Sequence, residues 1–155
     1  MEIYNLKEKQ EYIEEIATLS KIEWAEYNTE EELNKKIEET KNKIKNNLDN
    51  PYYCKLILLD NNNLVGFISI FPTDGDECQE LTPWYATMYV KKEYRGKGYS
   101  KKLNNAILKE AINLGYNKVY LKSELENYYE KFGAIFIEKL NENEKLYYIP
   151  LNNKF

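Results

Sequence analysis

The sequence predicts an α/β domain in which helices cover both faces of a mixed, mostly antiparallel sheet. Three observations carry this prediction. An aromatic and β-branched run, a glycine-rich loop and an amphipathic helix follow one another across residues 84–114. Two apolar runs at 52–59 and 64–71 are separated by a turn tract. Two further strand-like runs, 134–137 and 145–150, end the chain.

The first third of the chain predicts a short strand followed by two helices. Residues 2–6 suit a strand, and the apolar spacing over 8–27 is typical of an amphipathic helix. Thr29 and Glu32 form the pattern of a capping box, which predicts a second helix continuing to about residue 48. The apolar stripe of this second helix is thin, so we interpret it as a solvated flank over the core.

The rest of the chain alternates strands with turns and two helices. Asp60 and the three asparagines after it favour a hairpin turn. The acidic segment 74–77 leads into a strand over 81–90, and a helix begins near Ser100 and stops at Gly115. The remaining elements predicted before the final strand pair are a strand at 118–121 and a short helix at 127–132.

The segment Tyr94-Arg95-Gly96-Lys97-Gly98-Tyr99-Ser100 is predicted to hold a phosphate group. It connects a strand to a helix, whose first backbone N–H groups have no partner within the helix. Six basic residues and one acidic residue lie within 91–102, although the whole chain has a formal net charge of -4. The segment matches neither the G-x-x-x-x-G-K-[ST] nor the G-x-G-x-x-G nucleotide loop. A lysine-rich surface turn is the alternative interpretation.

Composition narrows the classes of function. The chain has 155 residues, which suits a single domain over 1–155, and it contains no histidine and only two cysteines. These counts exclude Ser-His-Asp and Cys-His catalysis and argue against a metal site. No apolar run reaches the length of a membrane span, and the first residues do not form a signal peptide, so we expect a cytoplasmic location. The overall acidity argues against nucleic acid as a partner.

Two motifs resemble those of the GNAT acetyltransferase superfamily. Arg95-Gly96-Lys97-Gly98-Tyr99-Ser100 resembles the R-x-x-G-x-G/A pyrophosphate loop, with serine at the last position. Tyr128-Tyr129-Glu130-Lys131-Phe132-Gly133-Ala134 resembles the L-Y-E-K-x-G-F motif, with tyrosine in place of leucine. The strand 81–90 is similar to the strand before the loop in a bacterial branch, so the resemblance covers about 81–137. It implies the GNAT fold and an acetyl-CoA-dependent N-acetyltransferase.

The resemblance also implies roles for individual residues. The backbone after Arg95 would hold the pyrophosphate, and exposed backbone groups at the end of the preceding strand would meet the thioester and the pantetheine arm. Tyr129 would be the general acid toward the thiolate, and Glu80 would be the general base, with Glu77 or Asp76 as second choices. The cofactor-binding residues implied in this way are Met88, Tyr89, Val90, Arg95, Gly96, Lys97, Gly98, Tyr99, Ser100 and Lys101.

The acceptor is the least determined part of the hypothesis. Superfamily members bind it near the region of Trp24 and Tyr27, and the acidic chain favours a cationic small-molecule amine. The alternatives are a protein N-acetyltransferase and a non-catalytic regulator that binds acyl-CoA. Homodimers are common among superfamily members, whereas nothing in these residues decides the oligomeric state.

Overall fold

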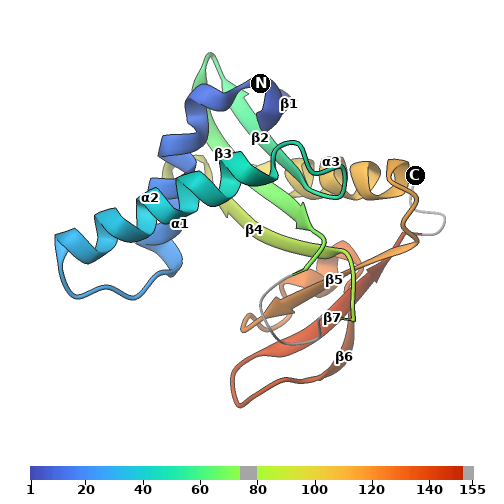
Figure 1. The fold of residues 1–155 in the computed structure, drawn as a ribbon. Helices are drawn as coiled ribbons and strands as arrows, with labels where there is room; N and C mark the ends of the chain where they lie inside the picture. The colour runs from blue at the N-terminus through green and yellow to red at the C-terminus, as the bar shows by residue number, and fades with distance from the viewer. Residues whose placement is uncertain (74–79, 152–155) are drawn as a thin grey trace.

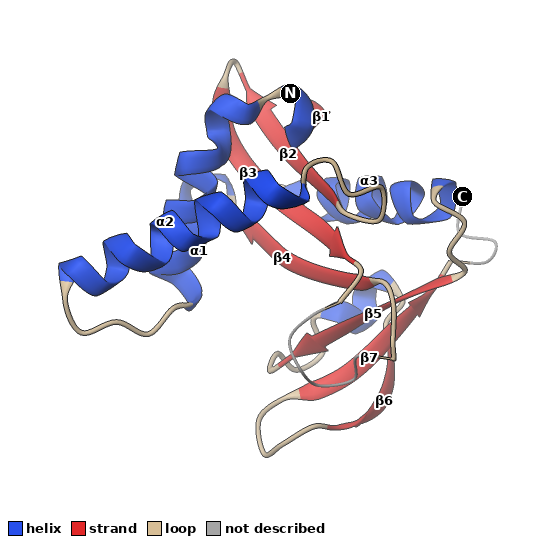
Figure 2. Ribbon diagram, viewed as in Figure 1, coloured by secondary structure: helices blue, strands red, loops and turns tan. Residues whose placement is uncertain are grey.

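A computed structural model, which describes residues 1–73 and 80–151, shows a seven-stranded sheet with helices on both faces (Figures 1 and 2). The strand order is β1-β2-β3-β4-β5-β7-β6. The strands are β1 (Glu2–Asn5), β2 (Cys54–Asp60), β3 (Asn63–Phe71), β4 (Trp84–Val90), β5 (Lys118–Ser123), β6 (Ile135–Lys139) and β7 (Lys145–Pro150). The helices are α1 (Ile13–Trp24), α2 (Glu30–Asn47) and α3 (Tyr99–Asn113).

The sheet divides between β4 and β5. β1 to β4 pair antiparallel, and β5, β7 and β6 form a second antiparallel group. β4 and β5 run parallel, and among the described residues the ladder between them has a single pair, Trp84 with Tyr120. Beyond this pair the two strands separate. The separation leaves backbone groups of both strands free of ladder hydrogen bonds, so they are available to a ligand.

Each face of the sheet has its own core. On one face, α3 packs Leu103, Ile107 and Ala111 against side chains of β2, β3 and β4. On the other face, α1 and α2 cover a second cluster that includes Ile57 and Phe67 (Figure 1). The alternation of strand residues explains the division, because neighbouring residues of a strand point to opposite faces. The mixed, mostly antiparallel sheet with helices on both faces confirms the predicted fold class.

The first helix is shorter than the predicted range 8–27. Two 3₁₀ turns, Leu6–Glu8 and Gln10–Tyr12, precede α1. The Asn5 side chain accepts a hydrogen bond from the Lys7 backbone N–H at 2.9 Å, and Lys9 has non-helical dihedral angles. A local side-chain cap therefore sets a separate turn before the amphipathic pattern begins.

Two further boundaries differ from the prediction. β4 begins at Trp84 rather than at residue 81, directly after the cis Thr82–Pro83 bond. The short helix expected at 127–132 is a 3₁₀ turn, Tyr129–Phe132, which ends at Gly133 in the left-handed region. The acidic positions 76 and 77 lie outside the described residues.

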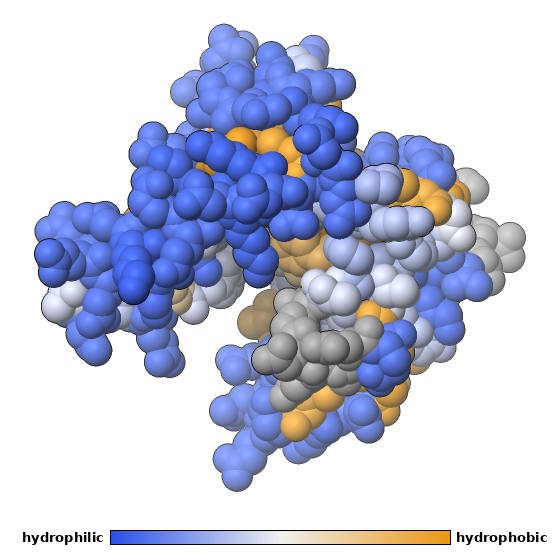
Figure 3. All heavy atoms as spheres, in the orientation of Figure 1, coloured by the Kyte–Doolittle hydropathy of each residue, from blue (hydrophilic) through white to orange (hydrophobic). Residues whose placement is uncertain are grey.

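α2 begins as the capping pattern predicts. The Thr29 hydroxyl accepts a hydrogen bond from the Glu32 backbone N–H at 3.1 Å, and the Glu32 carboxylate accepts one from the Asn28 N–H at 3.0 Å. The surface of α2 shown in Figure 3 is hydrophilic over almost its whole length, in agreement with a solvated flank. None of the described helices combines the length and the apolar character needed to cross a membrane.

Candidate functional site

A cleft of about 1550 Å³ opens where β4 and β5 separate. Its walls come from the end of α1, from β4, from the start of α3, and from the end of β5 with the turn that precedes β6. On the face shown in Figure 3 the molecule is hollowed between the side covered by α1 and α2 and the lobe of β5 to β7. A cleft of this size can hold an extended ligand together with a second small molecule.

A β-bulge shapes the wall that β4 contributes. Phe67 pairs with Tyr89 and Ser69 pairs with Ala86, so β4 has one extra residue between these pairs. Thr87 lies in this bulge with a φ of 53°, which is uncommon for a non-glycine residue. Bulges redirect side chains and interrupt pairing. Here the bulge lies along the cleft and breaks the regular ladder at residues 87 and 88, which line it.

The start of α3 fits an anion. Gly96 and Gly98 lie in the left-handed region, with φ of 77° and 84°, and Gly98 is the N-cap. No described side chain caps this helix, and its first turn has no acidic residue. α2, in contrast, has the Thr29 cap and three glutamates in its first turn. The helix dipole favours negative charge at an N-terminus. The unpaired backbone N–H groups at the start of α3 are therefore suited to bind an anionic ligand.

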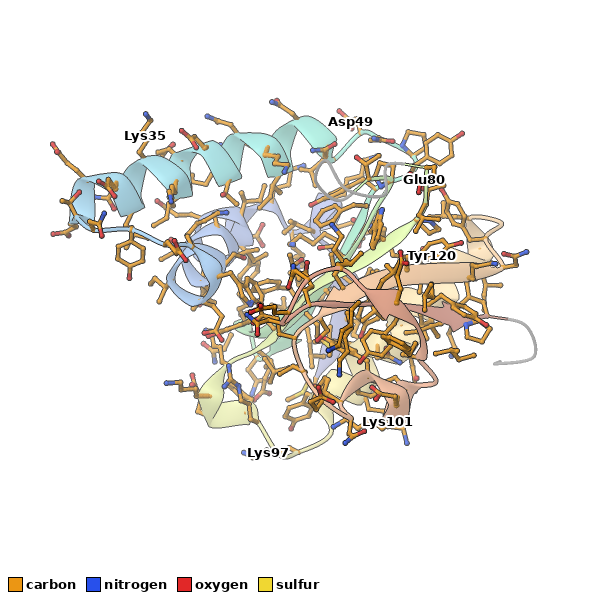
Figure 4. All side chains as sticks on the ribbon, turned by 90° about the horizontal axis from the view of Figure 1, so that it is seen from below. Lys35, Asp49, Glu80, Lys97, Lys101 and Tyr120 are labelled. Atoms are coloured by element: carbon orange, nitrogen blue, oxygen red, sulfur yellow. The ribbon has the colours of Figure 1, made fainter. Side chains whose placement is uncertain are left out.

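The basic residues around this loop point in different directions. Lys101 lines the cleft, whereas the Lys97 ammonium lies 6.0 Å from the centre of the Tyr94 ring and Lys97 is not part of the lining. Figure 4 shows both lysines at the same edge of the molecule. Lys102 turns away and donates to the Met1 carbonyl at 3.2 Å. The loop thus presents mainly backbone N–H groups to the cleft, with Lys101 beside them.

Arg95 connects the loop to β4. Its Nε donates to the Val90 carbonyl oxygen at 2.7 Å, and its guanidinium lies 5.6 Å from the centre of the Tyr89 ring. One of its five N–H donors is therefore occupied by a described residue, and the others could bind a phosphate. Of the implied cofactor residues, all except Lys97 line the cleft.

Tyr129 lies in the cleft among other aromatic side chains. Its ring makes edge contacts with Tyr85 at 5.8 Å and with Tyr128 at 4.8 Å between centroids. Tyr85 is buried, and its hydroxyl donates to Asn104 Oδ1 at 2.8 Å. Burial raises the pKa of Tyr129 to about 12, with a smaller contribution from Tyr128. Tyr129 is therefore protonated throughout the physiological range and can act as a hydrogen-bond donor.

Four glutamates line the cleft on two of its sides: Glu23 and Glu26 at the end of α1, and Glu124 and Glu144 at the ends of β5 and β7, where Lys122 and Lys131 also line it. The carboxylates of these residues form no ion pair with another described residue. Trp24, which is 49% exposed, lies between Glu23 and Glu26 in the chain and meets the Tyr89 ring edge-on at 6.0 Å. A cationic, partly apolar molecule could bind against the Trp24 ring beside Glu23 and Glu26.

Glu80 is not brought to this site. It is exposed, it precedes β4, and it is absent from the residues that line the cleft. Figure 4 shows it far from Lys97 and Lys101. Its role as a base therefore stays a prediction from the resemblance.

Several cleft residues were not anticipated. Thr87 lies within a predicted strand and Glu124 within a predicted connection, and a single sequence reveals neither a bulge nor the direction in which a strand ends. The sequence does contain one sign of a polar group in the interior. Lys55 interrupts the apolar run Cys54–Leu59, where a charged residue is unexpected.

Comparisons with known proteins agree with this geometry. The sequence model of the acetyltransferase (GNAT) family matches residues 13–134. A Schizosaccharomyces pombe N-alpha-acetyltransferase 30 is 32% identical over 89 residues, which span 54% of this chain and 59% of that relative, less than two thirds of its length. A Bacillus subtilis subsp. natto protein named probable spermine N(1)-acetyltransferase is 29% identical over 115 residues, covering 69% of this chain and 76% of the relative.

Solved structures share the fold over the whole chain. An aminoglycoside 6'-acetyltransferase type Ii has a TM-score of 0.72 and 18% identity, with all of both chains covered. The PaiA N-acetyltransferase from Thermoplasma acidophilum, solved in complex with coenzyme A, has a TM-score of 0.70 and 22% identity over 97% of this chain and 99% of that one. With the family match over most of its length, this chain belongs to the GNAT family of acetyl-CoA-dependent N-acetyltransferases.

Proposed function

We propose that this protein transfers the acetyl group of acetyl-CoA to a primary amine of a small, cationic molecule. One observation carries the proposal: a single cleft combines the uncapped, basic start of α3 with four lining glutamates that have no ion-pair partner among the described residues. The first feature suits a pyrophosphate and the second suits an ammonium group. The two substrates of an acetyl transfer would thus bind side by side.

The residues present fit acetyl-CoA. The backbone N–H groups that follow Gly98 and the ammonium of Lys101 would hold the pyrophosphate. The interrupted backbone of β4, around Met88, would receive the pantetheine arm and the thioester. A backbone N–H that is already oriented toward the carbonyl oxygen would stabilise the charge that develops there.

The transfer would proceed by direct attack of the amine on the thioester carbonyl. The nitrogen forms a bond to the carbonyl carbon, and the bond from carbon to sulfur breaks. Tyr129 would donate its proton to the leaving thiolate, for which it is suited because its raised pKa keeps the hydroxyl protonated. The proton lost from the attacking nitrogen balances the one given to sulfur.

Relatives support the acceptor class. One relative is named for spermine, and one structural neighbour is named for aminoglycosides; both are molecules with several ammonium groups. The match to an N-alpha-acetyltransferase favours a second candidate, the amino terminus of a polypeptide. A non-catalytic regulator is the remaining alternative, and a homodimer stays a prediction of the resemblance.

The experiment is a two-step assay. Calorimetric titration with acetyl-CoA, with ATP as a control, tests the cofactor, and release of free thiol in the presence of spermine, kanamycin or a short peptide with a free amino terminus tests the acceptor. We expect micromolar binding of acetyl-CoA and faster thiol release with a polyamine or an aminoglycoside than with the peptide. Release with the peptide alone would move the function to the second candidate. Binding without any release would favour the regulator.

A further inference from the structure

Lys55 is a buried lysine that the proposed mechanism has not used. It lies in the middle of β2 and is only 4% exposed. The Lys55 Nζ donates to the Ser69 hydroxyl at 2.7 Å and lies 4.9 Å from the centre of the Phe67 ring. Lys55 forms no ion pair with a described residue. A lysine that is buried without a carboxylate is costly to keep, because its charged form is poorly solvated there.

A short chain of hydroxyl groups leads from Lys55 to the cleft. The Thr87 hydroxyl donates to Ser69 Oγ at 3.2 Å, and the Lys55 Nζ also lies 3.4 Å from Thr87 Oγ1. Thr87 lines the cleft, whereas Lys55 and Ser69 are buried. The β4 bulge is what places this hydroxyl at the boundary. Three strands therefore contribute one polar group each to a path between the interior and the cleft.

We propose that Lys55 receives the proton of the acceptor ammonium through the hydroxyl groups of Thr87 and Ser69. The inference rests on the proposed function, because it needs an amine that must lose a proton before it attacks. It assigns the removal of that proton to a residue other than Glu80, which does not line the cleft.

The proton transfers balance. The acceptor ammonium gives one proton to the Thr87 oxygen, while the Thr87 hydroxyl proton moves to the neutral Lys55 amine, directly or by way of Ser69. This leaves a neutral nucleophile and a charged Lys55, which later returns its proton to solvent. A hydroxyl can serve in this way because it both donates and accepts, and its hydrogen rotates freely.

The surroundings of Lys55 favour the neutral amine. Burial lowers the pKa of Lys55 to about 7, and no charged group contributes to the shift. The titratable side chains near it on this face of the sheet include tyrosines: Tyr4 on β1, Tyr53 just before β2 and Tyr89 on β4, with Tyr12 beside them.

The helices over this face also carry charged groups, and some of these groups form ion pairs. Lys41 pairs with Glu14 and Glu38, and Lys91, which follows β4, pairs with Glu15. None of them affects the pKa of Lys55, so Lys55 is available as a base above about pH 7.

The test compares variants along the path. Lys55→Met keeps the length of the side chain and removes the amine, and it should fold because it removes a buried polar group. Thr87→Val removes the hydroxyl, and Thr87→Ser retains it. Thiol release is measured with spermine and with kanamycin between pH 6 and 9.5, and acetyl-CoA affinity is measured by calorimetry.

For the wild type we expect kcat/KM to rise with pH around 7. Lys55→Met should lose roughly 10²-fold at pH 8 and lack this rise, with acetyl-CoA affinity unchanged. Its deficit should shrink toward pH 9.5, where the acceptor loses its own proton to solvent. Thr87→Ser should recover most of the activity that Thr87→Val loses.

The outcomes separate this inference from the function on which it rests. A wild-type protein that releases no thiol with either amine would overturn both. An active wild type whose pH profile is unchanged in Lys55→Met would overturn the inference alone. Loss of the pH-dependent rise in Glu80→Gln but not in Lys55→Met would assign the role to Glu80 instead. A deficit in Lys55→Met that is equal at all pH values would show a purely structural role.

Discussion

Tyr129 is the residue whose proposed role can be tested most directly. Replacing it by phenylalanine removes the hydroxyl and keeps the ring in contact with Tyr85 and Tyr128. We expect kcat to fall by about 10²-fold with little change in acetyl-CoA affinity, because the hydroxyl would act on the leaving sulfur and not on the bound ground state. Steady-state kinetics and calorimetry measure the two quantities. Tyr128→Phe is the matched control, and a larger loss in that variant would assign the proton to Tyr128.

Individual residues differ in how far the sequence determines their role. Tyr129 was predicted because its position within a motif is visible in the sequence. The path from Lys55 through Ser69 to Thr87 was not, because it depends on the register of three strands and on one extra residue in β4. Nothing in the sequence Ala86-Thr87-Met88 indicates that this segment forms a bulge. The hydroxyls therefore meet only after the strands have paired.

At the scale of elements, the two ends of α3 offer an internal comparison. Gly98 begins the helix and Gly115 follows its end, and both have positive φ, 84° and 92°. A Cβ on either residue would meet no heavy atom within 4 Å. Alanine at either position should therefore lower the free energy of unfolding by a similar amount, about 1 kcal/mol, through backbone strain alone.

Only one of the two substitutions should affect ligand binding. Gly98 lines the cleft and Gly115 does not, so we expect Gly98→Ala to weaken acetyl-CoA binding by at least roughly tenfold and Gly115→Ala to leave it unchanged. Chemical denaturation and calorimetry on both variants check the prediction. Equal affinities would mean that the backbone at Gly98 does not approach the pyrophosphate.

Helix starts were predicted well where a capping pattern or a glycine loop marks them, and less well where no such pattern is present. The capping pattern placed the start of α2, and the glycine-rich loop placed the start of α3 within one residue. The region before α1 was misjudged because Asn5 forms a local turn that apolar spacing does not register. A single side chain that hydrogen-bonds to the nearby backbone can form a local turn in place of the first turn of a helix.

For the whole molecule, the fold class followed from the order of strands, turns and helices, whereas the cleft did not. The cleft exists because β4 and β5 share one ladder pair and then separate. Such a separation is a property of the complete sheet, which needs the packing of α3 on one face and of α1 and α2 on the other. Regular strand pairing made the fold predictable. The proposed function, in contrast, depends on the place where this pairing is interrupted, between β4 and β5.

The pH dependence of stability gives a prediction for the molecule as a whole. The pKa of Lys55 is about 7 in the folded protein, because of burial, and near 10.4 in an unfolded chain. Between these values the unfolded chain binds more protons than the folded one, so raising the pH favours the folded state. Lys55 raises the free energy of unfolding by at most about 1.4 kcal/mol for each pH unit in this range.

Lys55→Met lacks this group, so the stability of the wild type should rise relative to that of the variant between pH 7 and pH 9.5. Urea unfolding of both proteins at half-unit steps measures the difference, in which the contributions of the tyrosines cancel because both proteins contain them. Parallel curves would show that Lys55 remains protonated in the folded state over this range. A protonated Lys55 could not accept a proton, so the same measurement decides whether the buried lysine is available for the step proposed above.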